Sequence, residues 1–93
     1  MIEDELIKEF KKVIEESDVI ALKELHLDYM DTEFPREIDW PYIYQKVYLH
    51  ACLKKKKDMA AWVESLFDQV DPIQKIAYRQ TFAYGRTLLN KMR

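Results

Sequence analysis

The chain of 93 residues contains a single glycine, Gly85, and three prolines. Strands joined by tight hairpins need glycine at several turn positions, because those turns use backbone conformations that most other residues avoid. Helices joined by short turns need far fewer glycines. No segment of the sequence alternates polar and apolar residues well enough to predict a strand. The sequence therefore predicts an all-α protein.

Apolar residues recur at steps of three and four, which is the spacing of one face of a helix. We expect about five helices, over residues 3–16, 19–30, 40–54, 58–67 and 73–91. Asp18 and Asp39 are suited to cap two of them, because a side-chain oxygen there can accept from a free backbone amide. Residues 1–93 are thus predicted to form one domain of stacked antiparallel helix hairpins, either a short α-solenoid or an orthogonal bundle.

Two of the predicted helices have unusual features. The helix over residues 40–54 is apolar nearly all round, which is typical of a helix in the middle of a stack. The fifth helix contains Gly85, which should weaken it by about 1 kcal/mol relative to alanine. Either the helix breaks there, or a neighbour packs too close for a side chain. We expect Phe82 to lie off its inward face, which would contain Ile73, Ile76, Ala77, Tyr84 and Leu88.

A helix–turn–helix pattern occurs more than once along the chain. The pairs Val13-Ile14, Ala51-Cys52 and Thr81-Phe82 each precede a turn residue by the same distance, and these turn residues are Ser17, Lys55 and Gly85. The pattern resembles the ankyrin repeat, although the turn spacings of 38 and 30 residues differ from the family's period of about 33. The resemblance implies stacked hairpins that bind other proteins and have no catalytic residues. Degenerate repeats of this type are frequent in large DNA viruses and intracellular bacteria.

Few residues in the sequence have catalytic or metal-binding potential. His50 and Cys52 are two positions apart, so on a helix they point about 200° away from each other and cannot share a metal ion. The carboxylates cluster at expected helix starts and in the loop over residues 31–39, where solvent would surround them. A chain with one glycine has no phosphate-binding loop. We therefore expect no enzyme, no cofactor and no metal site.

The sequence also bears on the compartment. Cys52 is the only cysteine, so the chain has no internal disulfide, as is usual in a reducing compartment. The first residues lack the basic and apolar regions of a signal peptide, and no apolar run is long enough to cross a bilayer. We expect a cytoplasmic or nuclear protein without membrane association.

The net charge of −2 hides an uneven distribution. Residues 1–39 contain thirteen acidic and five basic side chains, whereas residues 40–93 contain four acidic and ten basic ones. Such a division of charge can form a surface that binds a charged partner. It can equally hold the two halves of one fold together.

The leading functional hypothesis is a non-catalytic module that binds another protein. Ankyrin-like modules commonly bind through their loops and first helices. This resemblance points to the loop over residues 31–39 and the start of the next helix. We expect the contacts to come from Phe34 and Arg36 in the loop and from the aromatic residues Trp40 and Tyr42, which we expect to be exposed.

The alternative hypothesis is a nucleic-acid-binding or nucleoprotein component. Basic residues gather in the run 54–57 and in the fifth predicted helix, where aromatic residues lie between them. The predicted basic patch contains Lys54, Lys55, Lys56, Lys57, Lys75, Arg79 and Arg86. An isoelectric point near 5.7 counts against this alternative, because phosphate binding usually needs a basic surface.

The end of the chain predicts a homodimer. Helix stacks need polar caps to stay soluble, but the last turns contain Leu88, Leu89 and Met92 with no later helix to cover them. A two-fold contact through this seam would cover them, and the alternative is a monomer whose long fifth helix folds back over its own core. Sedimentation at several protein concentrations tests the prediction. A mass that stays at 11.3 kDa at all concentrations would contradict it, and a dimer that persists in high salt would assign the contact to the apolar seam.

Overall fold

The computed structural model describes residues 2–66, 73, 76 and 78–90, and these residues contain helices and no strand. The helices are α1 (Ile2–Glu16), α2 (Val19–Met30), α3 (Trp40–Leu53), α4 (Lys57–Leu66) and α6 (Arg79–Asn90). The prediction of an all-α fold is confirmed. The predicted bounds of the first four helices agree with the structure to within one residue at each end.

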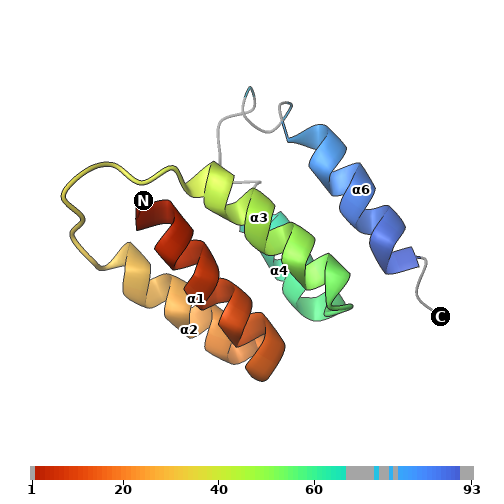
Figure 1. The fold of residues 1–93 in the computed structure, drawn as a ribbon, viewed down its shortest axis with the longest axis horizontal. Helices are drawn as coiled ribbons and strands as arrows, with labels where there is room; N and C mark the ends of the chain where they lie inside the picture. The colour runs from red at the N-terminus through yellow and green to blue at the C-terminus, as the bar shows by residue number, and fades with distance from the viewer. Residues whose placement is uncertain (1, 67–72, 74–75, 77, 91–93) are drawn as a thin grey trace.

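The helices form stacked antiparallel hairpins, as the sequence predicts. Helices α1 and α2 make one hairpin, and α3 and α4 make the next (Figure 1). Helices α1, α3 and α6 run in the same general direction with α3 in the middle, while α2 and α4 return on the other side and contact each other. The predicted central position of α3 is confirmed, since it packs against α1, α4 and α6.

Side chains and backbone turns set the helix ends. Asp18 accepts a hydrogen bond from the Ala21 amide at 3.0 Å, and Asp39 accepts one from the Tyr42 amide at 3.3 Å, so both predicted caps are present. Helix α3 ends in a turn where Lys55 has a φ of 66°. That left-handed conformation usually falls to glycine. Lysine therefore adopts here a backbone conformation that most residues other than glycine avoid.

The core lies between the two layers and around α3. It buries side chains from every described helix and one from the loop before α3: Leu6, Ile7, Phe10, Ile14, Leu22, Ile38, Ile43, Tyr44, Val47, Tyr48, Ala51, Cys52, Met59, Ala60, Val63, Leu66 and Phe82. The predicted inward face of the fifth helix is wrong for most of its members, although Leu88 packs partly against the core. Ile73, Ile76 and Tyr84 are exposed, whereas Phe82 is buried. Ala77 lies outside the described residues.

Gly85 explains which face of α6 turns inward. The helix is continuous through Gly85, and a Cβ atom built there would lie 2.9 Å from Cys52 Sγ and closer still to the Tyr48 ring. The Tyr48 and Phe82 rings also meet edge to face, with centroids 4.9 Å apart. The second sequence alternative is therefore correct: α3 packs too close for a side chain. The helix orients Phe82 and Gly85 toward α3 because only the glycine permits this approach.

We predict that Gly85→Ala destabilises the fold, although alanine favours helix formation. The added methyl group would push against buried Tyr48 and Cys52, and overpacking of this kind costs about 1–3 kcal/mol. Urea unfolding followed by circular dichroism measures the effect. Gln80→Ala, at an exposed position of the same helix, is the control and should leave the unfolding midpoint nearly unchanged. A Gly85→Ala variant as stable as the native chain would contradict the close packing.

Candidate interaction surface

The aromatic residues predicted to bind a partner lie half-buried against the core of the chain itself. The Phe34 ring packs near Tyr29, with centroids 6.4 Å apart. The Trp40 ring lies 5.8 Å from that of Tyr44. Tyr42 packs partly on the core. The expectation that Trp40 and Tyr42 are exposed is therefore wrong, because the start of α3 turns inward to join the stack.

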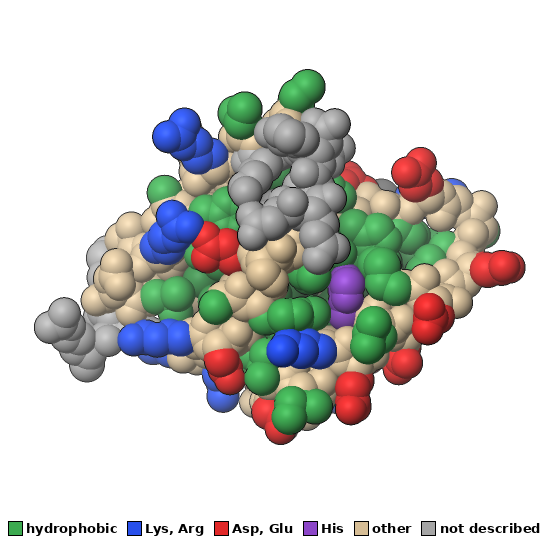
Figure 2. All heavy atoms as spheres, turned by 180° about the vertical axis from the view of Figure 1, so that it is seen from behind, with side chains coloured by type: hydrophobic (Ala, Val, Ile, Leu, Met, Phe, Trp, Pro, Cys, Tyr) green, Lys and Arg blue, Asp and Glu red, His purple; other side chains and the backbone are tan. Residues whose placement is uncertain are grey.

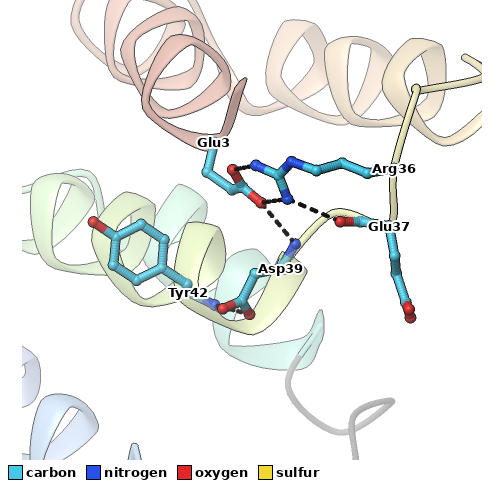
Figure 3. Close-up of polar contacts among 5 residues, drawn as sticks. All are labelled: Glu3, Arg36, Glu37, Asp39 and Tyr42. Carbon is cyan, nitrogen blue, oxygen red and sulfur yellow. Dashed lines mark hydrogen bonds and ion pairs between the residues drawn. The ribbon is translucent and has the colours of Figure 1, made fainter. Parts of the chain in front are cut away.

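The fourth predicted contact residue, Arg36, is committed to an internal ion pair. Its guanidinium donates two hydrogen bonds to the Glu3 carboxylate, one of them at 2.7 Å from Nη1 to Oε2 (Figure 3). The Asp39 amide also donates to Glu3 Oε2, at 3.2 Å. Arg36 Nη1 further donates to the Glu37 carbonyl at 3.0 Å. This Glu3–Arg36 clamp fastens the loop before α3 to the first turn of α1.

Glu3 is a buried carboxylate held in its ionised form. Only 2% of its surface is exposed. The hydrogen bonds from Arg36, assisted by the backbone amides and the arginine charge, lower its pKa to about 2. Burial alone would raise that pKa, so the hydrogen bonds prevail. The clamp therefore has a structural role, although 48% of the Arg36 side chain stays exposed.

His26 sits within a cluster of aromatic rings. The rings of Phe10, Trp40, Tyr44 and Trp62 all have centroids within 6.4 Å of the imidazole centroid. Its Nε2 atom lies 2.8 Å from the Tyr44 hydroxyl, and burial lowers the pKa of His26 and raises that of Tyr44 to about 12. The cluster borders a cavity of about 10 Å³, which is at the lower limit for one water molecule. The cavity is therefore too small for an organic substrate.

The described residues also offer no obvious metal site. No group of three or more His, Cys, Asp or Glu side chains lies close enough to hold an ion in that part of the chain. Cys52 is buried, which raises the pKa of its thiol. None of the helices that the structure describes has the length and apolar character needed to cross a membrane.

Acidic partners within the chain occupy part of the predicted basic patch. Lys54 Nζ lies 3.1 Å from Glu15 Oε1, and Arg86 pairs with Glu64. Lys55, Lys57 and Arg79 are exposed, Lys56 is half-buried, and Lys75 lies outside the described residues. The pair between Glu15 and Lys54 joins α1 to α3. The acidic and basic halves of the sequence thus meet at that point inside one chain.

Two residues of the predicted dimer seam are partly covered by their own chain. Leu88 and Leu89 are half-buried and pack against the core, while Met92 lies outside the described residues. The homodimer stays a prediction. A contact through this seam would gain less apolar area than two fully exposed leucines would provide.

The sequence analysis missed an apolar stripe on the outer side of α2. Three of the seven large apolar side chains exposed in the described part of the chain lie on this one helix: Ile20 at 62%, Leu27 at 61% and Met30 at 42%. They are seven and three positions apart, so they follow one side of the helix. Leu22 is buried on the opposite side, where Leu25 and Tyr29 also pack against the core. A test for apolar residues on both sides of the helix would have found the α2 stripe.

Acidic side chains border the α2 stripe. Glu24 and Asp28 are both exposed and lie one helical turn apart along one edge of it, and Asp31 follows the end of the helix. Lys23 is the only basic residue between residues 16 and 31, which contain five carboxylates. In Figure 2, acidic side chains gather on the right, the side on which α2 lies, and basic ones gather on the left. The α2 stripe is therefore apolar apart from Lys23, which lies between Ile20 and Leu27, and it has a negative rim along one edge.

No family model matches the chain, and neither a curated protein nor a solved structure is significantly similar to it. The ankyrin-like repeat stays a prediction.

We predict that the Glu3–Arg36 clamp makes stability depend on acid. Because the pKa of Glu3 is lower in the folded chain than the ordinary value of 4.5, its contribution is complete above pH 4.5. That contribution is lost as the pH falls toward about 2. Glu3→Gln should therefore be less stable than the native chain at pH 7 and should show a smaller loss of stability between pH 4.5 and 2.

Urea unfolding midpoints across this pH range measure the difference. Glu5→Gln, which removes an exposed carboxylate two residues away, is the matched control and should keep the acid dependence of the native chain. Equal pH profiles for Glu3→Gln and Glu5→Gln would show that the clamp does not stabilise the fold.

Proposed function

We propose that the chain is a non-catalytic module that binds another protein through the α2 stripe. The observation that carries this proposal is the exposure of Ile20, Leu27 and Met30 on one side of a helix whose other side packs on the core. A surface helix with polar residues outward needs no partner. A helix that is apolar on both sides is typical of one that is covered on both sides.

The location of the α2 stripe suits such a role. Helix α2 lies at one end of the layer that it shares with α4 (Figure 1). Helix α2 contacts α1 and α4 on its inner side, and α3 contacts α1, α4 and α6. The loop over residues 31–39, where the sequence placed the contacts, is fastened by the Glu3–Arg36 clamp. A partner that covers α2 would therefore add to the stack without displacing any of these contacts.

The nucleic-acid alternative has less support from the geometry. Lys54 and Arg86 each pair with a carboxylate of the chain, which lowers the positive charge available to phosphate groups. The α2 stripe has an acidic rim, which repels them. We therefore retain protein binding as the proposed function.

We predict that polar substitutions in the α2 stripe abolish partner binding and leave the fold intact. Ile20→Gln and Leu27→Gln place a good helix former at exposed positions, where substitutions usually change stability by less than about 0.5 kcal/mol. Affinity capture from an extract of the source cells, followed by mass spectrometry, compares the native chain with the doubly substituted one. Proteins retained by the native chain should be lost with the double variant.

Leu53→Gln is the matched control, since Leu53 has a similar exposure of 57% but lies at the end of α3. It should retain the same proteins as the native chain. Partners that are lost with Leu53→Gln and kept by the double variant would place the binding surface elsewhere. Circular dichroism of each variant checks that the helices are intact.

A further inference from the structure

We infer that the partner of the α2 stripe is a basic amphipathic helix of another protein; this inference rests on the proposed function. The spacing of the exposed apolar side chains on α2 suits a helical partner. Ile20 and Leu27 are two turns apart on a straight helix, and Met30 extends the line by three residues. A second helix that lies along α2 can contact all three side chains with apolar residues at steps of three and four.

The basic character of the partner follows from the rim. Glu24 and Asp28 lie along one edge of the α2 stripe, and Lys23 lies within it, about one turn from both Ile20 and Leu27. Residues 16–31 carry five carboxylates and one lysine, a net charge of −4 with histidine neutral. Lysine or arginine side chains beside the apolar face of a partner helix would meet this negative charge. Complementary charges of this kind favour the correct partner and speed its approach.

Other occupants of the α2 stripe fit the charge less well. A second copy that used the same stripe in a two-fold contact would bring two segments of charge −4 together, and like charges facing each other oppose association. The surface of an anionic membrane is repelled by the same rim, whereas helices that lie on such membranes are usually rich in lysine and arginine on the polar face. A basic helix satisfies both the apolar stripe and the acidic rim.

Three synthetic helical peptides test the inference with the full chain. They share one stripe of leucines at steps of three and four, and they carry lysine, glutamine or glutamate among the alanines of the remaining positions. Fluorescence anisotropy measures their affinity. We expect the lysine peptide to bind about tenfold more tightly than the glutamine peptide at low salt, and the difference to shrink as salt rises.

Two sets of variants separate the apolar and charged contributions. Ile20→Gln with Leu27→Gln should weaken binding of the lysine peptide at least about tenfold, while Leu53→Gln should not. Glu24→Gln with Asp28→Asn should reduce the preference for the lysine peptide about threefold or more. Glu37→Gln, which neutralises an exposed carboxylate outside the α2 stripe, should keep that preference.

The outcomes distinguish the two proposals. Equal binding of the lysine and glutamine peptides, with loss of both in the Ile20 and Leu27 variant, would overturn the basic partner and leave the proposed function standing. A different result would be that the lysine peptide binds the Ile20 and Leu27 variant as tightly as it binds the native chain. That result would assign its binding to charge attraction elsewhere and would overturn the inference. Failure of all three peptides would count against both proposals. Sedimentation of the chain with phosphatidylserine vesicles that depends on Leu27 would assign the α2 stripe to a membrane.

Discussion

The packing of α3 is the constraint on which the rest of the fold depends. This helix contributes Ile43, Tyr44, Val47, Tyr48, Ala51 and Cys52 to the core, and no other described helix buries as many residues. Its sides contact α1, α4 and α6. A small domain buries a limited share of its surface. A central helix that packs against several others lets one element contribute to most of the core. Substitutions along α3 should therefore affect every layer of the molecule.

Side-chain contacts near both ends of α3 fix its position. At its start, Asp39 caps the helix while the Asp39 amide donates to Glu3, so one residue links the cap to α1. Near its end, Tyr48 and Cys52 lie against Gly85 of α6. The Glu3–Arg36 clamp and the Gly85 contact thus act at opposite ends of the same helix. The clamp joins groups 33 positions apart in the sequence, and the glycine permits an approach that any larger residue would prevent.

Features that depend on local sequence pattern could be predicted. The helix bounds follow from apolar periodicity and from caps such as Asp18, and the central place of α3 follows from its apolar circumference. The inward face of α6 was wrong because that helix has two apolar sides, one with Tyr84 and one with Phe82. The choice between them is made by contact with Tyr48. The pairing of Arg36 with Glu3 was not predicted, because it is a long-range contact that no local spacing reveals. The α2 stripe could have been predicted, since Ile20 and Leu27 are visible opposite Leu22 in the printed sequence.

The exposed apolar side chains of α2 and α6 differ in whether one partner could cover them. In α6, Tyr84 is the one large apolar side chain that is exposed. In α2, Ile20, Leu27 and Met30 follow one another along the helix, so a single partner can cover them together. Burial of this apolar area would favour association, and the carboxylates beside it would restrict the choice of partner by charge. An acidic rim would make such an apolar surface selective for a basic partner, and among the described residues the two features occur together on α2.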